Sequence, residues 1–284
     1  MARSRNPYER RGRLFEGRRV IVTGASSGIG RDTATIFAQE GASVALFARR
    51  EQMLTRLAGE IESRGGRALP IACDVSDQEQ VKDAIAKARK EFGGIDVLIN
   101  NAGVLIPSPF RSARLEDLRR MMDINFFGAV HATQAVLPLM EQQRRGNIVN
   151  IASIAGRRGG ITLSGYSASK SALIGFTEAL RSELFGSGIV ASLVVPASVD
   201  TQMLDNPEWE SRRWAVANFK MPPRLVTLGV IAAVTLGMAE VEVPLGIVTA
   251  QKIAGLFPDL TAAWLGLGSR AIEAINEWMG TRIR

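Results

Sequence analysis

The sequence predicts an α/β fold, a doubly wound parallel sheet with helices on both faces in a three-layer α/β/α arrangement. Short apolar runs rich in β-branched residues alternate with helical patterns from Arg18 onward, and parallel strands buried on both faces have such sequences. A glycine-rich turn joins the first apolar run to the first helical pattern. The 284 residues, 46% of them hydrophobic and 22% charged, suffice to bury one large core.

The first half of the chain supplies four strand–helix pairs. Each apolar run is short, is bounded by glycine or polar residues, and leads into a longer segment with helical periodicity. Right-handed crossovers are the default for connections of this kind. The predicted strands are 19–23, 43–47, 67–72 and 96–99, and the helices that follow them are 30–39, 51–64, 77–92 and about 115–143.

The alternation continues through two more strands and then breaks. Strands are predicted at 147–151 and 189–195, with a helix over 166–185 between them. Residues 197–222 contain Asn206-Pro207 and Met221-Pro222-Pro223, which indicates a long irregular segment. The prediction ends with a helix at 224–239, a short strand at 241–244 and a C-terminal helical extension at 247–284.

The single cysteine and the single histidine exclude several kinds of site. Cys73 has no partner for an internal disulfide, and because it follows an apolar strand we expect a buried, unreactive thiol in a cytoplasmic protein. His131 lies inside a helical pattern, so we expect it to be structural. Neither residue supplies a His-rich or multi-cysteine metal site, and no metal is expected.

Positive charge is concentrated partly at the N-terminus. The chain carries a formal charge of +7, and seven arginines lie within residues 1–19. No nucleic-acid-binding motif follows them, so residues 1–17 are interpreted as a solvated basic arm, and no nucleic-acid partner is expected. Contact of the arm with an acidic partner or a membrane surface is the alternative. The arm lacks the apolar core of a secretory signal, and the uncharged stretch 225–239 is shorter than a bilayer span.

The turn after the first strand has the spacing of a dinucleotide-binding loop. Thr23 to Gly30 reads T-G-A-S-S-G-I-G, with a helix beginning at its end. Glycines let the backbone approach a pyrophosphate, and a helix N-terminus offers free N–H groups and the positive end of its dipole. The residues expected to contact the nucleotide are Gly24, Ser26, Ser27, Gly28, Ile29 and Gly30.

The same turn also matches G-x-S-x-G, the nucleophile elbow of an α/β-hydrolase. A hydrolase of that kind needs a histidine on a late loop. His131 is in the first half of the chain and inside a helical pattern. The dinucleotide interpretation is therefore favoured.

The end of the second strand favours NADP over NAD. An NAD site usually places an acidic residue there to bind the ribose 2′-hydroxyl. Here Ala48 is neutral, and Arg49 and Arg50 follow it. Guanidinium groups form paired hydrogen bonds with a 2′-phosphate, so both arginines are candidates to bind it. The alternative for Arg50 is an exposed residue at the start of the next helix.

A tyrosine and a lysine four residues apart supply candidate acid–base chemistry. Tyr166 and Lys170 lie on one face at the start of a predicted helix. A phenol has a reference pKa near 10, and a nearby ammonium lowers the pKa towards the working range. Ser153 lies just beyond the fifth strand, at the sheet edge where active sites form, and its hydroxyl can bond a substrate carbonyl oxygen.

Four motifs in order resemble those of the short-chain dehydrogenase/reductase family over about residues 15–202. Thr23–Gly30 resembles the family's T-G-x-x-x-G-x-G, and Asn100-Asn101-Ala102-Gly103 resembles its N-N-A-G. Tyr166-Ser167-Ala168-Ser169-Lys170 resembles Y-x-x-x-K, with Ser153 at the position of the family's serine. The resemblance implies one Rossmann-like dinucleotide-binding and catalytic domain over 18–246, and assembly as a homodimer or homotetramer.

The resemblance also implies roles for individual residues. Tyr166 would be the catalytic acid–base, Ser153 would orient the substrate oxygen, and Lys170 would hold the nicotinamide ribose. Asn125 would anchor a water-borne proton relay. The further cofactor contacts implied are Asp74, Val75, Asn101, Ala102, Gly103, Pro196, Val199 and Thr201.

One position departs from the family pattern. After the sixth strand the family usually has Pro-Gly, whereas this chain has Pro196-Ala197. If the position needed a positive φ, alanine would cost about 1 kcal/mol or shift the loop. The nicotinamide end is therefore the part of the site that the resemblance defines least.

The sequence thus predicts an NADP-dependent oxidoreductase that interconverts a small-molecule carbonyl and an alcohol. Aromatic and apolar residues after the sixth strand, Trp209, Trp214, Phe219, Met221 and Trp264, suggest an apolar substrate, although packing explains them equally well. Two alternatives remain. One is a cofactor-binding regulatory or scaffold protein with little turnover, and the other is an enzyme that docks on a membrane surface.

Overall fold

The computed structural model describes residues 13–201 and 220–246, and residue 256. Most of the predicted basic arm, most of the irregular segment after the sixth strand and nearly all of the C-terminal extension lie outside these residues. Four of the residues considered above, Trp209, Trp214, Phe219 and Trp264, are therefore not placed.

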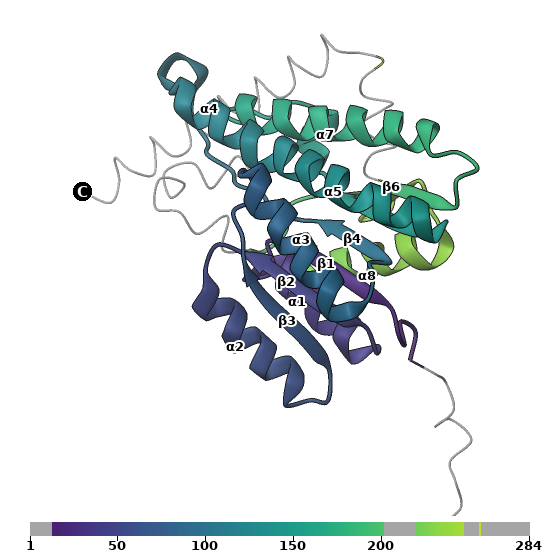
Figure 1. Cartoon of the computed structure of the whole chain (residues 1–284). Coiled ribbons are helices and arrows are strands. Elements are labelled where there is room, and N and C mark those ends of the chain that lie inside the picture. The colour runs from purple at the N-terminus through teal and green to yellow at the C-terminus, as the bar shows by residue number, and fades with distance from the viewer. Residues whose placement is uncertain (1–12, 202–219, 247–255, 257–284) are drawn as a thin grey trace, which may run out of the picture.

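Seven strands in the described residues form one sheet, and every pairing in it is parallel. The order β3-β2-β1-β4-β5-β6-β7 reverses direction between β1 and β4, which makes the sheet doubly wound (Figure 1). The predicted fold class is confirmed for this part of the chain. The strands are β1 (Arg19–Thr23), β2 (Ser43–Ala48), β3 (Arg67–Ala72), β4 (Val97–Asn100), β5 (Gly146–Ile151), β6 (Ile189–Pro196) and β7 (Glu240–Val243).

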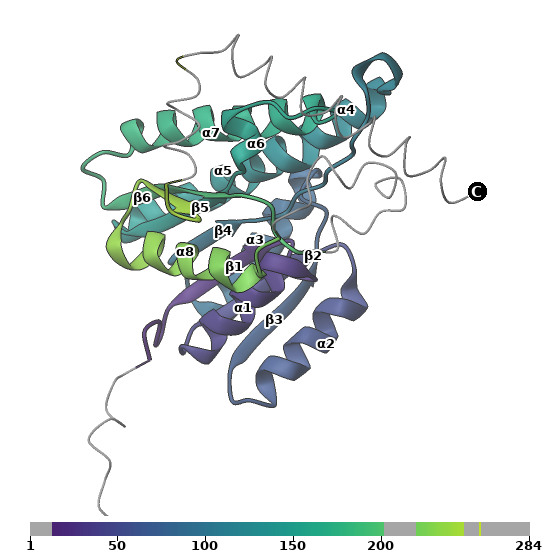
Figure 2. The ribbon, with the colours of Figure 1, turned by 180° about the vertical axis from the view of Figure 1, so that it is seen from behind.

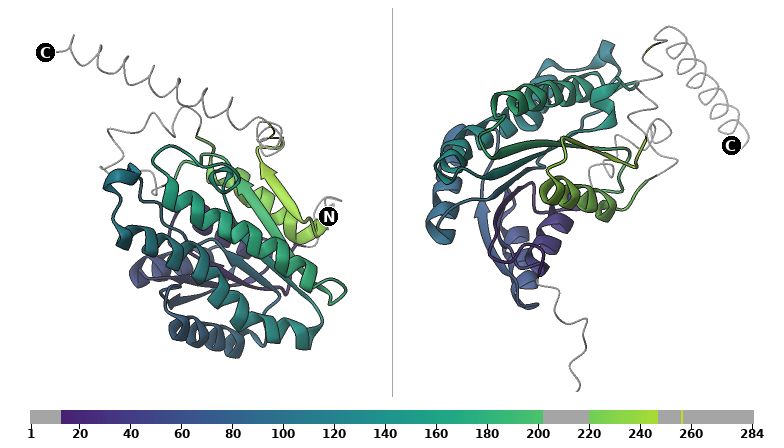
Figure 3. Two further views of the ribbon diagram at one scale, coloured as in Figure 1. Left: turned by 90° about the horizontal axis from the view of Figure 1, so that it is seen from above. Right: turned by 90° about the vertical axis from the view of Figure 1, so that its right-hand side faces the viewer.

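Helices cover both faces of the sheet because strand residues alternate between two cores. Val20 and Val22 of β1 pack in one cluster, whereas Ile21 between them packs in the other. Figures 1 and 2 show the two helical layers from opposite sides, and Figure 3 shows them from above and from the side. The first layer contains α1 (Gly28–Gln39), α2 (Glu51–Glu62) and α8 (Pro223–Leu236), and the second contains α3 (Gln78–Phe92), α5 (Gly128–Gln143) and α7 (Ser164–Glu183).

The single helix expected over 115–143 contains a change of winding. It consists of α4 (Leu115–Met122), a π-helical turn η3 (Asp123–Phe127) and α5. π-Helical turns are rare and are frequent at functional sites, and this one contains Asn125. Two single-turn elements that the sequence did not predict are η2 (Phe110–Ser112) and α6 (Ile154–Arg157).

Packed structure begins before the expected domain boundary at residue 18. The Phe15 ring is buried and stacks on Phe37 of α1 with ring centroids 4.1 Å apart. The Phe15 N–H donates to the Glu40 carbonyl oxygen at 2.8 Å. The last residues of the predicted arm are thus part of the core. Among the described helices, none is both long and apolar enough to cross a bilayer.

Candidate active site

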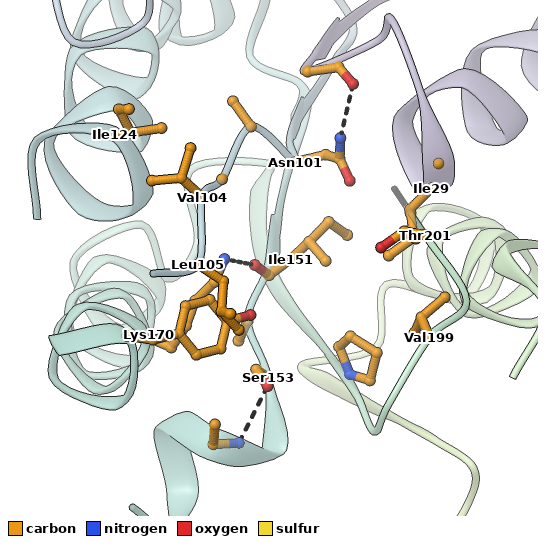
Figure 4. Close-up of a pocket in the computed structure, with 18 of the residues that line it drawn as sticks. Ile29, Asn101, Val104, Leu105, Ile124, Ile151, Ser153, Lys170, Val199 and Thr201 are labelled. Carbon is orange, nitrogen blue, oxygen red and sulfur yellow. Dashed lines mark hydrogen bonds between the residues drawn. The ribbon is translucent and has the colours of Figure 1, made fainter. Parts of the chain in front are cut away.

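A cavity of about 530 Å³ runs along the carboxyl ends of β1 to β6. This edge of a doubly wound sheet is where ligands bind, beside the point at which the strand order reverses. Figure 4 shows Val104, Leu105, Ser153 and Lys170 on one side of the cavity, facing Ile29, Val199 and Thr201 on the other. Most of the residues predicted from the sequence line it: Gly24, Ser26, Ser27, Gly28, Ile29, Arg49, Arg50, Asp74, Val75, Asn101, Ala102, Gly103, Ser153, Tyr166, Lys170, Pro196, Val199 and Thr201.

The glycine-rich loop brings backbone rather than side chains to the cavity. Gly24 has φ +66°, and a Cβ atom there would lie 2.8 Å from the Ala102 Cα. Gly28, the first residue of α1, has φ +55°. The first turn of α1 contains no acidic residue, so its free N–H groups and dipole favour an anion. The loop therefore fits a pyrophosphate.

Hydrogen bonds join this loop to the turn after β4. The Thr23 hydroxyl accepts from the N–H groups of Asn101 and Ala102, both at 3.0 Å. The Asn101 amide donates back to the Thr23 carbonyl oxygen at 2.9 Å. The first two sequence motifs thus form one hydrogen-bonded unit, and this unit fixes one wall of the cavity.

Gly30 does not line the cavity, although the sequence placed it among the cofactor contacts. A Cβ atom there would collide with the Asn101 side chain and the Gly24 carbonyl group. The third glycine is required because α1 packs closely against the loop, which is a packing role described for this type of turn.

Arg49 and Arg50 stand at the end of β2 with different partners. Arg50 donates to the hydroxyl groups of Ser26 at 3.0 Å and Ser27 at 3.3 Å. Arg49 lies 3.9 Å from an Asp74 carboxylate oxygen, and more than half of its side chain is exposed. The structure therefore places two guanidinium groups beside the glycine-rich loop, where an adenosine ribose would lie.

His131 has a structural role that also supports the cavity. Its Nδ1 lies 3.0 Å from the carbonyl oxygen of Val75, and its ring stacks on Phe127. A Cβ atom at Gly128 would lie 2.7 Å from Val75 Cγ2, so α5 approaches the turn after β3 closely. His131, the only histidine of the chain, thus helps to position Val75, which lines the cavity.

Tyr166 and Lys170 occupy one face of α7, one helical turn apart, and both are buried. The Lys170 ammonium donates to the Ile151 carbonyl oxygen at 2.8 Å and lies 5.9 Å from the centre of the Tyr166 ring. Ser153 caps α6, its hydroxyl accepting from the Ala155 N–H at 3.1 Å (Figure 4). The three side chains therefore meet in the wall of one cavity.

Burial shifts the pKa values of the two titratable groups in opposite directions. Loss of solvation raises the pKa of Tyr166 to about 12, and a hydrogen bond with Ser153 partly offsets this. Loss of solvation lowers the pKa of Lys170 to about 8. At neutral pH the phenol is therefore protonated and can donate a proton, while the neighbouring ammonium retains most of its charge.

Asn125 does not line the cavity, and its side chain fixes a residue that does. Its Oδ1 accepts from the Val104 N–H at 2.7 Å, and its Nδ2 donates to the Val104 carbonyl oxygen and to the Ser169 hydroxyl, both at 2.9 Å. Asn125 is thus a buried bridge from the π-helical turn to the turn after β4 and to α7. Its part in a proton relay stays a prediction.

The segment after β6, which the family resemblance assigns to the nicotinamide end, lines the cavity. The positive-φ residues other than glycine in the described chain are Arg144 and Thr162, so Ala197 does not have the strained backbone that a glycine would relieve. Its N–H donates to the Val243 carbonyl oxygen at 2.8 Å. Alanine in place of the family's glycine therefore causes no backbone strain at position 197.

Sequence reasoning missed much of the remaining wall. Apolar side chains of Val104, Leu105, Ile124, Ile154 and Leu163 line the cavity, as does Arg158. No local motif marks these residues, which reach the cavity through tertiary packing. Cys73 also lines it; its thiol is buried, and burial, with Asp74 and Asp77 nearby, raises the pKa to about 12, so the expected unreactive thiol is consistent with its surroundings.

Comparisons with known proteins agree with this geometry. A family model described as short chain dehydrogenase matches residues 18–211. The chain is 35% identical over 207 residues to the 3-oxoacyl-(acyl-carrier-protein) reductase FabG of Thermotoga maritima, covering 73% of this chain and 84% of that protein. It is 33% identical over 265 residues to the ketoacyl reductase HetN of Nostoc sp., covering 93% and 90%.

A solved structure shows the same architecture. It is a short chain dehydrogenase/reductase from Burkholderia phymatum in complex with NAD, and it superposes with a TM-score of 0.81 at 26% sequence identity. The match covers 87% of this chain and 96% of the other.

Proposed function

This chain belongs to the short-chain dehydrogenase family, and from that premise we propose that it catalyses reversible hydride transfer between NADP(H) and a carbonyl or alcohol substrate. One observation carries the proposal. Ser153, Tyr166 and Lys170 line the same cavity as the glycine-rich loop and the two arginines after β2. A nicotinamide dinucleotide fits this arrangement because the loop presents backbone and a helix N-terminus at one end and acid–base groups at the other.

The bound nicotinamide coenzyme would supply or accept the hydride, and the side chains of the chain would handle the proton. In the reductive direction Ser153 donates a hydrogen bond to the substrate oxygen and orients the carbonyl group. Tyr166, protonated at neutral pH because burial raises its pKa to about 12, donates its proton to that oxygen as it gains charge. Positioned acid–base groups of this kind contribute about 10²- to 10⁴-fold in rate.

Lys170 has two tasks in this proposal. Its ammonium lies on the face of α7 that carries Tyr166, so its charge stabilises the phenolate that remains after proton transfer. It would also bond the hydroxyl groups of the nicotinamide ribose. Water held near Asn125 would return the proton to Tyr166 through Lys170.

The preference for NADP rests on Arg49 and Arg50. Two guanidinium groups beside the glycine-rich loop provide charge and paired donors for a 2′-phosphate. The one nearby carboxylate among the residues lining the cavity, Asp74, is turned towards Ser76, which donates to it from its hydroxyl at 2.7 Å. Asp74 follows β3, whereas NAD sites usually have their acidic residue after β2. The other carboxylate oxygen of Asp74 lies 3.9 Å from Arg49.

The substrate is proposed to have an apolar body. Val104, Leu105 and Leu163 line the cavity and pack in the same cluster as Tyr166, and such walls favour apolar groups over water. The names of the FabG and HetN relatives point to 3-oxoacyl thioesters as the first substrates to test.

The test is NADPH and NADH oxidation across a carbonyl panel that contains 3-oxoacyl thioesters, cyclic ketones and steroid ketones. Wild-type enzyme is expected to oxidise NADPH with at least one member. Tyr166→Phe, which keeps the ring and removes the proton donor, is expected to lose at least about 100-fold in kcat. Equal rates in the two proteins would refute the mechanism, and absence of turnover across the panel with intact NADPH binding would favour a cofactor-binding protein without this activity.

A further inference from the structure

We propose that the cavity holds an anion-binding subsite at Arg158, so that the substrate carries a carboxylate or phosphate as well as its carbonyl group. This proposal rests on the proposed function, because it describes the substrate of that reaction. It adds a charged group to the apolar body inferred above.

Arg158 lies close to the catalytic groups along the chain. It is the C-cap of α6, and Ser153 is the N-cap of the same element. With a helical rise of 1.5 Å per residue, the two Cα atoms are separated by about 6 to 10 Å. Both residues line the cavity. An anion bound by Arg158 would therefore lie in the same cavity as a carbonyl group at Ser153 and Tyr166.

The neighbouring arginine shows what Arg158 lacks. The Arg157 guanidinium lies 2.9 Å from a Glu178 carboxylate oxygen and 2.7 Å from one of Glu240. Arg158 lines the cavity and has no ion pair with any residue in the described part of the chain. One arginine of the pair is used for structure, and the other is left available for a ligand.

The charges around the cavity separate into two groups. At the adenosine end, Arg49 and Arg50 stand with Asp74, which is the one acidic residue among the described residues that line the cavity. At the catalytic end, the cations are Lys170 and Arg158. Lys170 is engaged with the Ile151 carbonyl oxygen, whereas a guanidinium beside apolar walls offers paired donors that match a carboxylate or phosphate.

The backbone around Arg158 is fixed, with open space beside it. The Ser171 hydroxyl donates to the Gly156 carbonyl oxygen at 2.6 Å, and the Ser108 N–H donates to the Thr162 carbonyl oxygen at 2.9 Å. A Cβ atom at Gly159 would have no neighbour within 4 Å. The Arg158 N–H itself donates to the Ile154 carbonyl oxygen at 3.1 Å, so the backbone fixes the point from which the arginine side chain extends.

The experiment compares acids with their esters. Calorimetry measures the binding of 5-oxohexanoate and of methyl 5-oxohexanoate to the full chain saturated with NADP+, which cannot reduce a ketone. A second arm compares acetol phosphate with acetol. Both arms are run on wild type, Arg158→Gln, Arg158→Lys and Arg64→Gln, the last an exposed arginine outside the cavity.

In at least one arm, wild type is expected to bind the anion about 10- to 100-fold more tightly than its neutral analogue, as charge-assisted hydrogen bonds do. Arg158→Gln is expected to abolish that difference and to leave binding of the neutral analogue within about 3-fold of wild type. Arg158→Lys is expected to retain part of the difference in affinity. Arg64→Gln is expected to leave the difference unchanged. The arm that responds identifies carboxylate or phosphate as the anion. Equal binding of anion and neutral analogue by wild type in both arms, or an equal effect of Arg158→Gln on each, would overturn the subsite.

Turnover of the same ketones with NADPH is measured separately. Anion-selective binding that depends on Arg158, with no turnover of any ketone, would count against the proposed function and leave the subsite standing. Turnover of the neutral ester without anion-selective binding would support the proposed function and count against the subsite.

Discussion

At the adenosine end of the cavity the walls are mostly backbone and exposed arginines, whereas at the catalytic end they are buried side chains. Gly24 and Gly28 have positive φ angles and no side chain to occupy the space, and Arg49 is more than half exposed. Tyr166 and Lys170 are almost completely buried. The adenosine end has open space because its glycines carry no side chains. The catalytic end shifts the pKa values of its side chains by excluding water.

This difference means that the two ends should respond to substitution in different ways. Changes at the adenosine end should alter cofactor affinity and cofactor choice with little dependence on pH. Changes at the catalytic end should alter pH dependence and the proton-transfer step. The following predictions test this contrast, from the largest expected effect to the smallest.

Gly24→Val should weaken NADPH binding by at least about 100-fold. A β-branched residue disfavours φ +66°, and its Cβ atom would meet the backbone of Ala102 at 2.8 Å. Fluorescence titration of NADPH measures the effect. Gly59→Ala is the matched control, because nothing lies within 4 Å of an added Cβ in α2, and it should raise stability by about 0.5–1 kcal/mol without changing affinity. NADPH affinity within a few-fold of wild type in Gly24→Val would show that backbone approach is not what this end provides.

Lys170→Met should remove a rise in wild-type stability between about pH 8 and pH 10. Burial lowers the pKa of Lys170 to about 8 from its usual 10.5, so above pH 8 the unfolded chain binds more protons than the folded one and stability increases with pH. The effect is about 3 kcal/mol at most.

Denaturant unfolding across this pH range, with cofactor absent, measures the effect. The exposed Lys87 provides the control, as Lys87→Met should follow the wild-type profile. Above pH 10 stability should begin to fall with pH in wild type and in Lys170→Met. Burial raises the pKa of Tyr166 to about 12 from 10.0, so its phenol ionises first in the unfolded chain. Parallel profiles for wild type and Lys170→Met from pH 8 to 10 would contradict the lowered pKa.

Arg49→Gln should reduce the NADPH-to-NADH ratio of kcat/KM by about 10- to 100-fold, the range of a lost charge-assisted hydrogen bond to a phosphate. Arg50→Gln should act similarly but also release Ser26 and Ser27, to which Arg50 donates, so it should weaken both coenzymes. Arg64→Gln controls for net charge. A wild-type preference for NADH that Arg49→Gln leaves unchanged would overturn the proposed coenzyme preference.

Ala197→Gly should have the smallest effect. Ala197 has no positive φ, so glycine relieves no strain and lowers stability by about 0.5–1 kcal/mol through chain entropy. Thermal unfolding and NADPH titration measure the two quantities, and cofactor affinity should stay within about 2-fold. A clearly tighter complex in Ala197→Gly would mean that alanine distorts the nicotinamide end.

The sequence predicted the strands and the motif residues well because both depend on local pattern. β1 and β3 have the predicted bounds, and β7 differs by one residue at each end. α1 begins two residues earlier than expected, after Ser27, which serves as its N-cap. The π-helical turn at Asp123–Phe127 was not predictable, since apolar periodicity hardly changes when one turn gains a residue.

The rest of the cavity wall depends on tertiary contacts that no local pattern reveals. α6 is a single turn held by hydrogen bonds and ion pairs to α7 and β7, and it brings Arg158 to the cavity. The pairing of Asn125 with Val104 likewise joins segments far apart in sequence. Motifs therefore identified many of the residues that line the cavity, but not the apolar side chains and Arg158 that complete its wall.

The central claim is that Lys170 makes a phenol with a burial-raised pKa usable for proton transfer. The direct measurement is the pH profile of single-turnover alcohol oxidation by the enzyme–NADP+ complex, in wild type and Lys170→Met, with a substrate identified from the carbonyl panel. Oxidation needs the phenolate of Tyr166, so the wild-type rate should rise with pH. Over about pH 6 to 8, where Lys170 retains much of its charge, the profile of Lys170→Met should be displaced to higher apparent pKa by at least about one pH unit because the ammonium is gone. Identical apparent pKa values in the two proteins would contradict the claim.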